Sequence, residues 1–286
     1  MISKIFFWGY RFVIKHVWIL FVAGMVTAMM AGSAIAGPGG SPQFGVGQID
    51  NSTDRFYLRN SLDAGQPDLN FKFSVGIVGA LPLVGDWDGN GTMTPGFYDP
   101  ATSRFYLRNS QDAGQPDENF KFSVGISGVV PVVGDWNDDN NWTVGLYDPV
   151  GERFYLRNSL SAGLPDFNFA FNIGVSGIVP FAGDFDGNGT FTIGTFDPMT
   201  KRFWLSNTNA TGPVAATYVF SVGVATVVPI MGDWDNNGTY TPGLNDEATD
   251  RFYLRNANNA GLPDAGNFKF SVGIVGTTGT AGVWSP

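Results

Sequence analysis

The sequence predicts an all-β protein: a single β-propeller of five four-stranded blades, closed by pairing of its N- and C-terminal strands. One phrase, RFYLRN or a close variant, returns five times, and its opening arginines are 49 positions apart (104 − 55 = 49, and likewise for each later pair). Each repeat contains four short strand-like runs, the usual content of a propeller blade. The incomplete repeats at the two ends of the chain together supply the strands of one blade. The five arginines are Arg55, Arg104, Arg153, Arg202 and Arg251.

Residues 1–36 have the composition of a secretory signal peptide. Basic residues up to His16 precede an uncharged apolar stretch at 17–30, and Ser-Ala-Ile-Ala follows at 33–36. We therefore expect cleavage after Ala36 and a secreted protein, either extracellular, periplasmic or at the cell surface. The alternative is an uncleaved N-terminal anchor, although the charge-free run is shorter than the ~20 residues of a spanning helix. Residues 37–43 form a Gly/Pro-rich linker, and residues 44–286 form the repeat domain.

Composition excludes several classes of function. Removal of the signal peptide takes away three of the sixteen Lys and Arg residues and none of the 25 Asp and Glu residues, so the mature net charge is 13 − 25 = −12. This acidity argues against binding to nucleic acid or to an anionic membrane. The chain has no cysteine, and its one histidine is His16 in the signal peptide. The mature protein therefore lacks Ser-His-Asp triads, Cys-His dyads and the usual zinc sites.

Within each repeat, apolar and polar residues alternate between clusters of Gly, Pro, Asn and Asp, which is typical of strands joined by turns. In RFYLRN of the second repeat, Phe105 and Leu107 share one face, and Tyr106 and Arg108 share the other. No segment after residue 36 has the pattern of a helix. The strands expected in the second repeat are 94–99, 104–109, 119–125 and 129–134.

The chain ends favour ring closure. Gly47 and Asp50 lie 49 positions before Gly96 and Asp99, so the repeat domain begins in the middle of a unit. At the other end, residues 281–284 resemble residues 231–234. The last strand should therefore complete a sheet begun at the N-terminus, which leaves few exposed strand edges. An open array, or a propeller divided between chains, is the alternative arrangement of such repeats.

Four loops in register carry oxygen-bearing side chains at loop positions 1, 3 and 5, followed by Gly or Asn at position 6. This spacing can wrap oxygens around a hard cation such as calcium. The alternative is that Asp and Asn accept backbone N–H bonds and simply hold tight turns. The aromatic residue at position 2 should point into the core. The residues at positions 1, 3 and 5 are Asp86, Asp88, Asn90; Asp135, Asn137, Asp139; Asp184, Asp186, Asn188; and Asp233, Asp235, Asn237.

These loops, the strand TPGFYDP that follows, and the repeat length resemble the FG-GAP or VCBS family of secreted β-propeller repeats. The resemblance covers residues 44–286 and implies a calcium-stabilised propeller used for recognition or adhesion. Where the family has a final loop aspartate, this chain has threonine, and position 5 is aspartate only at Asp139. Fewer carboxylates imply weak calcium binding, near the millimolar range of extracellular modules. The threonines are Thr94, Thr143, Thr192 and Thr241.

A second recurrent set pairs an aromatic residue with arginine in the RFYLRN strand. Aromatic rings beside fixed polar donors can bind sugars, and repeated weak sites gain by multivalency. Alternatively, these side chains fill the gaps between blades, with each arginine paired to an aspartate of the neighbouring unit. The fourth repeat differs, with Trp204 and Ser206, and it also lacks the Gly-x-Pro-Asp turn of the others. The candidate ligand-binding residues are Tyr57, Arg59, Tyr106, Arg108, Tyr155, Arg157, Trp204, Tyr253 and Arg255.

We therefore expect a secreted, non-enzymatic interaction or adhesion module whose partner is an extracellular protein or polysaccharide. A multivalent carbohydrate-binding lectin is the alternative. A carboxylate-based glycosidase or lyase is less favoured, because the acidic residues recur at turn positions and glutamate occurs only at Glu118, Glu152 and Glu247. The sequence leaves the oligomeric state open.

Overall fold

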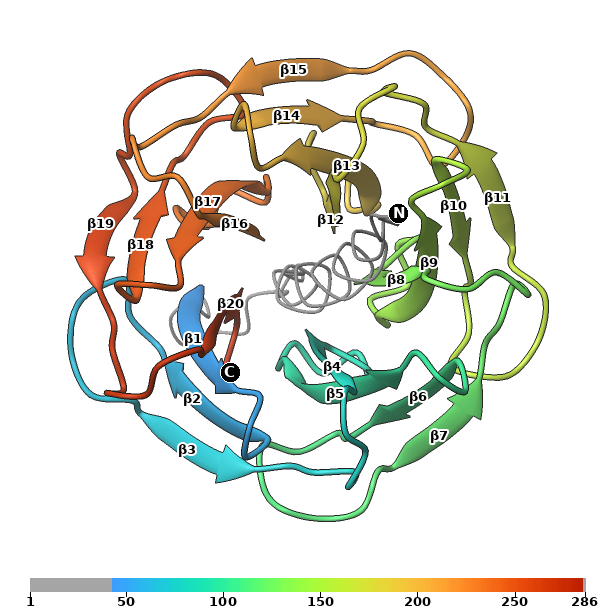
Figure 1. Ribbon diagram of the computed structural model, residues 1–286, viewed down its shortest axis with the longest axis horizontal. Helices are drawn as coiled ribbons and strands as arrows, with labels where there is room; N and C mark the ends of the chain where they lie inside the picture. The colour runs from blue at the N-terminus through green and yellow to red at the C-terminus, as the bar shows by residue number, and fades with distance from the viewer. Residues whose placement is uncertain (1–42, 285–286) are drawn as a thin grey trace, which may run out of the picture.

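A computed structural model describes residues 43–284, so the expected signal peptide and nearly all of the linker lie outside the described residues. Five four-stranded antiparallel sheets surround a central axis (Figure 1). The predicted five-bladed propeller is thus confirmed. Between residues 43 and 284 there is no helix long and apolar enough to cross a membrane.

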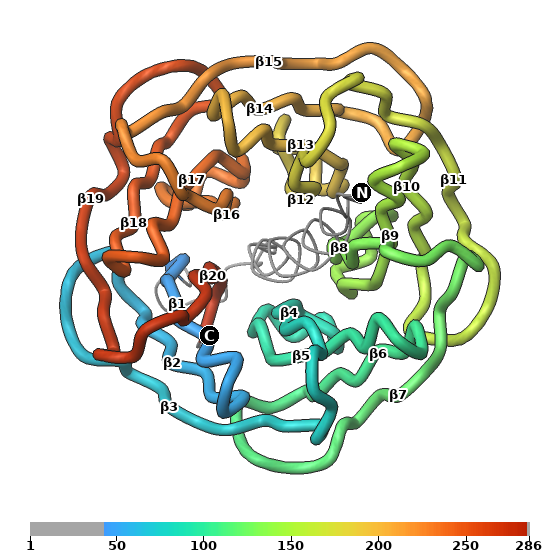
Figure 2. The backbone as a smooth tube through the Cα atoms, viewed as in Figure 1, coloured from blue at the N-terminus to red at the C-terminus, as the bar shows by residue number. Residues whose placement is uncertain are grey.

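Each blade contains an inner strand near the axis and an outermost strand at the rim (Figure 2). In blades 2 to 5 the backbone runs outward through the four strands in turn, whereas in blade 1 the C-terminal strand β20 lies inside β1, β2 and β3. Blade 1 contains β20 (Thr278–Gly282), β1 (Gly45–Asp50), β2 (Arg55–Arg59) and β3 (Leu69–Lys72). Blade 2 contains β4 (Leu81–Gly85), β5 (Thr94–Asp99), β6 (Arg104–Leu107) and β7 (Glu118–Lys121). Blade 3 contains β8 (Val130–Gly134), β9 (Thr143–Asp148), β10 (Arg153–Leu156) and β11 (Phe167–Ala170). Blade 4 contains β12 (Val179–Gly183), β13 (Thr192–Asp197), β14 (Arg202–Leu205) and β15 (Ala216–Val219). Blade 5 contains β16 (Val228–Gly232), β17 (Thr241–Asp246), β18 (Arg251–Leu254) and β19 (Gly266–Lys269).

Burial follows the distance of a strand from the axis. Every residue of the inner two strands is buried, whereas the third strand alternates between buried and half-buried side chains. In β6, Phe105 and Leu107 are fully buried, and Arg104 and Tyr106 are half-buried, as the period of two predicts. Aromatic pairs across strands, such as Phe105 with Phe120 at 5.6 Å between centroids, connect the outer strands.

The predicted outer strand at 119–125 is longer than the strand observed, because β7 ends at Lys121. The amide of Phe122 donates to the carbonyl of Ser103, and Gly125 then adopts a φ of 75°, which turns the chain toward the next blade. Phe122 is nevertheless fully buried. The strand expected at 119–125 therefore ends at Lys121, although the chain beyond it still packs into the core.

The ring closes within one chain. β1 pairs antiparallel with β20, from Gly45 opposite Gly282 to Ile49 opposite Thr278. The indole of Trp284 lies inside this blade and donates to the carbonyl of Val46 at 3.1 Å. The closure predicted from the two partial repeats is therefore confirmed.

Backbone hydrogen bonds also link neighbouring blades at the end of the ring where the aspartate loops lie. The amide of Trp142 donates to the carbonyl of Asp86 in the preceding blade at 2.8 Å, and equivalent bonds join Phe191 to Asp135 and Tyr240 to Asp184. Their rings pack together, with Trp142 and Phe191 at 4.7 Å and Phe191 and Tyr240 at 4.9 Å between centroids. The blades of the propeller are thus joined by aromatic contacts between neighbours, which the spacing of residues in the sequence did not reveal.

The interface between blades 5 and 1 is unusual because two amide side chains occupy positions that hold apolar or aromatic residues, or in one case threonine, in the other repeats. Gln48 and Asn245 are fully buried there, and each leaves its side-chain oxygen without a hydrogen-bond partner. The repeat-equivalent positions of Gln48 hold Phe97, Leu146, Thr195 and Leu244, and those of Asn245 hold Ile49, Tyr98, Tyr147 and Phe196. A Cβ at Gly279 would overlap the Asn245 side chain, so glycine makes room for this amide. We call Gln48, Asn245 and Gly279 the polar seam.

Candidate functional site

The aspartate loops fold around their first carboxylate. In the loop after β4, Asp86 accepts hydrogen bonds from the amides of Asn90 at 3.0 Å and Gly91 at 2.8 Å, one on each oxygen. Asp88 accepts from the side-chain amide of Asn90 at 3.0 Å, and the Asn90 oxygen accepts from the amide of Thr92 at 2.8 Å. The side chains at positions 1, 3 and 5 are thus connected within one loop.

The other three loops repeat this arrangement at position 1. Asp135, Asp184 and Asp233 each accept amides from positions 5 and 6 of their own loops. Residues at positions 4 and 6 have positive φ angles, which explains why Gly, Asn or Asp occupies them. The position-9 threonines donate instead to the carbonyl of the last inner-strand residue, as Thr94 does to Gly85 at 3.2 Å. This is the geometry of Asx-type turns.

Burial raises the pKa of the first aspartates, to about 6 for Asp86, even though two amides stabilise the charged form. The pKa values of Asp135, Asp184 and Asp233 shift in the same direction for the same reason. Among residues 43–284 no three Asp, Glu, His or Cys side chains gather tightly enough to ligate one metal ion. A cation in these loops would therefore rely on two carboxylates together with amide and backbone oxygens, a thin ligand set for calcium.

The aromatic residues at loop position 2 belong to the core, as predicted. Trp87, Trp136, Phe185 and Trp234 are at most 8% exposed. Trp87 donates its indole N–H to the carbonyl of Pro95 at 3.3 Å. These rings therefore do not form a binding platform at the surface.

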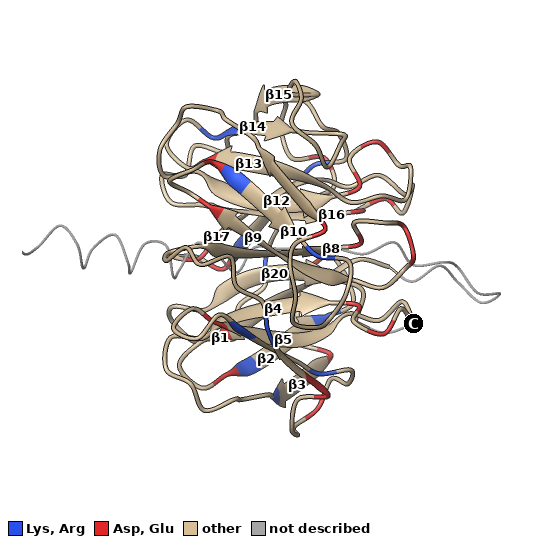
Figure 3. Ribbon diagram, turned by 90° about the vertical axis from the view of Figure 1, so that its right-hand side faces the viewer, with Lys and Arg blue, Asp and Glu red and all other residues tan. Residues whose placement is uncertain are grey.

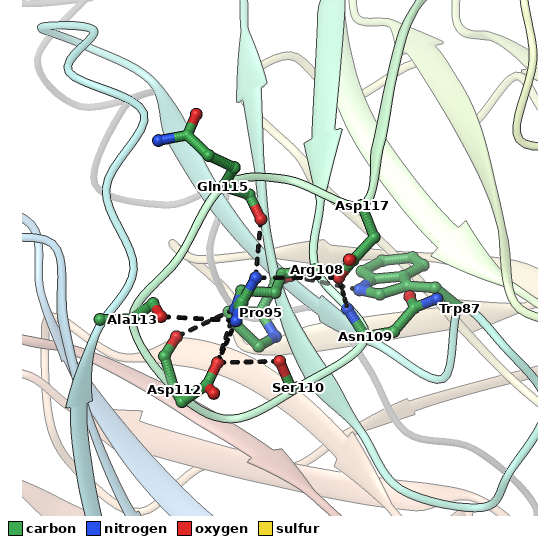
Figure 4. A network of polar contacts seen from close by, with 9 residues as sticks. All are labelled: Trp87, Pro95, Arg108, Asn109, Ser110, Asp112, Ala113, Gln115 and Asp117. Atoms are coloured by element: carbon green, nitrogen blue, oxygen red, sulfur yellow. Dashed lines mark hydrogen bonds and ion pairs between the residues drawn. The ribbon is translucent and has the colours of Figure 1, made fainter.

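The arginine that ends RFYLR organises the loop that follows it. In blade 2, Arg108 lies inside the loop 108–117, where its Nε donates to Asp112 at 2.7 Å and its Nη1 donates to the carbonyl of Gln115 at 2.7 Å (Figure 4). Asp117 accepts the amide of Asn109 at 2.8 Å and holds the two ends of the loop together. The Arg108 side chain is 13% exposed, although its ion-pair partner Asp112 is 63% exposed. We call such a loop an arginine-centred loop.

Arginine-centred loops recur in blades 1, 3 and 5, around Arg59, Arg157 and Arg255. The prediction that each arginine pairs with an aspartate of the neighbouring unit is wrong, because Arg59 pairs with Asp63 of its own loop at 2.5 Å. The loop closes back on the strand that carries the arginine, so the nearest carboxylate and carbonyls are local. The Gly-x-Pro-Asp turn has a specific role here, since a Cβ at Gly114 would overlap the Arg108 guanidinium.

Blade 4 builds its loop without arginine. Ser206 is buried, and its hydroxyl donates to the carbonyl of Thr208 at 2.8 Å. Asn209 fixes the loop by donating to the carbonyl of Phe191 at 2.8 Å. At the opposite end of β14, Lys201 occupies a left-handed turn position and donates to the carbonyl of Ala225 at 2.6 Å, and its burial lowers its pKa.

The predicted aromatic and arginine residues separate in space. Tyr57, Tyr106, Tyr155, Trp204 and Tyr253 are half-buried on the faces of the third strands. The arginines two positions later turn into their own loops, where most of their N–H groups already have acceptors. The tyrosines instead have different polar neighbours: the arginine that opens each strand and the asparagine opposite on the outermost strand. The register of β2 with β3 identifies these residues, and the sequence alone does not provide that register.

The three glutamates lie in different blades. Glu118 is exposed on β7, Glu152 accepts the amides of Ile173 at 2.6 Å and Gly174 at 3.0 Å, and Glu247 follows β17 near the polar seam. A glycosidase-type pair needs two carboxylates on one site, on the order of 5–10 Å apart. Their placement in blades 2, 3 and 5 gives no support for a pair formed by glutamates.

Comparisons with known proteins name no family for this chain. No protein-family model matches the sequence, and no curated protein matches it. Among solved structures, the search matches the crystal structure of BBS1N in complex with ARL6DN, soaked with mercury, at a TM-score of 0.33 and 12% sequence identity. The match covers 61% of this chain and 53% of that chain, so it spans about half the length of the solved structure. The FG-GAP or VCBS resemblance stays a prediction from the repeated loops.

Proposed function

We propose that this protein is an exported, non-enzymatic binding module that engages an extracellular protein or polysaccharide. The observation that carries this proposal is the set of arginine-centred loops. Four blades present a loop of the same construction at the same end of the ring, and each loop is held by a nearly buried guanidinium. Loops fixed on a rigid scaffold are a common location for recognition.

The tips of these loops differ while their frames are alike. The residue before the turn proline is Gln66, Gln115, Leu164 and Leu262 in blades 1, 2, 3 and 5, and the two leucines are 83% and 78% exposed. Because the arginine fixes the frame before any partner arrives, binding would lose little conformational entropy. A repeated frame with variable tips suits recognition better than catalysis.

A broad solid-phase screen of the exported protein tests this proposal, with envelope polysaccharides and extracellular matrix proteins as the panel. Leu164→Ala and Leu262→Ala should weaken capture of a partner found in the screen. Val150→Ala is the matched control, since Val150 is 90% exposed in the β9–β10 turn at the opposite end of blade 3. Capture of nothing in the panel, or equal losses for all three variants, would contradict a binding surface built on these loops.

A multivalent lectin is the second candidate. It is favoured by the half-buried aromatic residue on the third strand of every blade, because flat rings pack against sugar faces. A glycan array with and without calcium tests it, and binding to no glycan in either condition would reject it.

We further propose that calcium stabilises the aspartate loops weakly. In the loops after β4 and β16, each carboxylate oxygen of Asp86 and Asp233 accepts one backbone amide. Each oxygen therefore keeps a further lone pair that could bind a cation. The ion would stabilise the conformation of the loops, and two carboxylates per site would bind it weakly.

A further inference from the structure

Three adjacent blades place two cations directly opposite each other at their outer rims. In blade 1, Arg55 of β2 is the register partner of Lys72 of β3, so both side chains lie on the same face of the sheet. Blade 2 has the same pair in Arg104 and Lys121, and blade 5 has it in Arg251 and Lys269. Figure 3 shows that Lys and Arg lie on the strands, whereas Asp and Glu lie mainly in the loops at both ends.

These cations are largely without partners inside the described part of the chain. Among residues 43–284, no carboxylate lies within 4.0 Å of either member of the three pairs, and the lysines donate no hydrogen bond to another residue of this range. Arg55 donates through one nitrogen to Asn70 Oδ1 at 2.6 Å. Like charges directly opposite each other destabilise a sheet. This repulsion between like charges recurs in three blades, which suggests that an external anion offsets it.

Acidic residues near the pairs are turned inward. Asp50 is the β1 register partner of Arg55, but it is buried and its carboxylate accepts from Ser52 and Thr53. Asp54, half-buried before Arg55, accepts from Ser74. In blade 5 the corresponding Asp246 and Asp250 are buried and similarly bonded. Since the lysines stand on the outermost strands and are exposed, an approaching ligand meets positive charge first.

Each pair is part of a larger polar face. Tyr57 lies two positions after Arg55 and opposite Asn70, so the four residues Arg55, Tyr57, Asn70 and Lys72 share one side of blade 1. We call this set a cationic quartet. The aromatic ring offers a flat apolar surface, the amide can bond a hydroxyl, and the two cations can bind an anionic group. The other complete quartets are Arg104, Tyr106, Asn119, Lys121 in blade 2 and Arg251, Tyr253, Asn267, Lys269 in blade 5.

We propose that the cationic quartets of blades 5, 1 and 2 bind an anionic polysaccharide, one whose sugar rings carry carboxylate or sulfate groups. The tyrosine packs on a sugar ring, the arginine and lysine bind its anionic group, and the asparagine bonds a hydroxyl. This inference rests on the proposed function as a binding module and adds the class of ligand. The overall negative charge of the protein does not prevent it, because charges more than about 8–10 Å away are largely screened at physiological salt.

Blades 3 and 4 are natural controls for this proposal. Opposite Arg153 stands Ala170, and opposite Arg202 stands Val219, so neither blade has the lysine. Alanine at this position is therefore compatible with the blade fold. Three neighbouring complete quartets would bind one polymer more tightly than separate sites do, because the second and third contacts are intramolecular.

Binding of the exported protein to immobilised alginate, a polyuronate, tests the proposal, with dextran sulfate as a sulfate-bearing polymer and neutral dextran as the uncharged control. We expect binding to one or both charged polymers that weakens as salt rises, and little binding to dextran. The triple variant Lys72→Ala, Lys121→Ala, Lys269→Ala should bind about tenfold or more weakly, because each exposed charge contact contributes a factor of about two to five. Ala170→Lys in the otherwise wild-type protein should complete a fourth quartet, in blade 3, and strengthen binding by about two- to fivefold.

Circular dichroism and urea unfolding confirm that the variants are folded. Equal binding of charged polymers and dextran, or an unchanged affinity of the triple variant, would overturn the proposal. If neither charged polymer binds but another partner is captured in the broad screen, the quartets are rejected while the binding module stands. If the charged polymers bind and Leu164→Ala and Leu262→Ala have no effect, the quartets stand and the loop tips are not the surface used.

Discussion

Protonation of Glu247 should control the stability of the ring near its closure. Glu247 follows β17 beside the polar seam, and its Oε1 is buried with no hydrogen-bond partner. Burial raises the pKa of Glu247 from 4.5 to about 7, and a hydrogen bond from Thr278 opposes the shift only in part. The folded protein therefore holds this proton more tightly than the unfolded chain does.

The sign of the effect follows from linkage. The neutral acid favours the folded state fully below pH 4.5, and this contribution is lost as the pH rises toward and through about 7. The difference between 4.5 and about 7, at roughly 1.36 kcal/mol per pH unit, limits the effect to about 3 kcal/mol. Glu247→Gln keeps the shape and removes the charge, so it should match the wild type near pH 4 and exceed it by up to that amount near pH 8.

Urea unfolding of both proteins at pH 4, 6 and 8 measures this difference. Other acidic groups, such as Asp86, titrate in both proteins, so the difference between them isolates Glu247. Glu118→Gln, at an exposed position on β7, is the matched control and should show the same offset at every pH. A Glu247→Gln offset that does not change between pH 4 and pH 8 would refute the reasoning.

Three further predictions concern the loops and the seam. Arg108→Ala should lower the free energy of unfolding by about 1–3 kcal/mol, because the carbonyl of Gln115 and the carboxylate of Asp112 lose their donor; an unchanged urea midpoint would show that water replaces the guanidinium. If the aspartate loops bind calcium, a thermal melt in 10 mM calcium should exceed one with chelator by several degrees; equal midpoints would assign these loops to Asx-type turns alone. The double variant Gln48→Leu, Asn245→Leu should be as stable as the wild type or more so, because replacing both polar groups removes two unpaired oxygens; a large loss in urea would mean that the seam amides are satisfied by water.

Much of the aspartate-loop and core geometry follows from local patterns. The aromatic residues at loop position 2 were assigned to the core because residues alternate along a strand, and Trp136 is 1% exposed. The first aspartates hold turns, as Asp and Asn commonly do, and their acceptor bonds involve residues within five positions. Interactions of such short range can be read from sequence because the chain itself keeps the partners close.

Other features could not be predicted because they depend on the path of a loop or on which residues meet across strands or blades. The partner of Arg59 was expected in the next repeat, yet it is Asp63, four positions away, because the loop folds back around the guanidinium. Pairing of Arg55 with Lys72 depends on the register of β2 with β3, two strands that the loop at 60–68 separates in the sequence. The polar seam requires the last blade to meet the first, which joins Gln48 to Phe270 of blade 5, 222 positions later in the chain.

By itself, the sequence determined the fold class, the number of blades and the closure of the ring, because a repeat of constant length must place the same strands at every turn of the structure. Only the tertiary structure decided which chemistry each repeated residue performs. The same arginine type binds its own loop at position 59 and faces outward beside a lysine at position 55, since cross-strand register and loop return, and not residue identity, set the neighbours of each side chain.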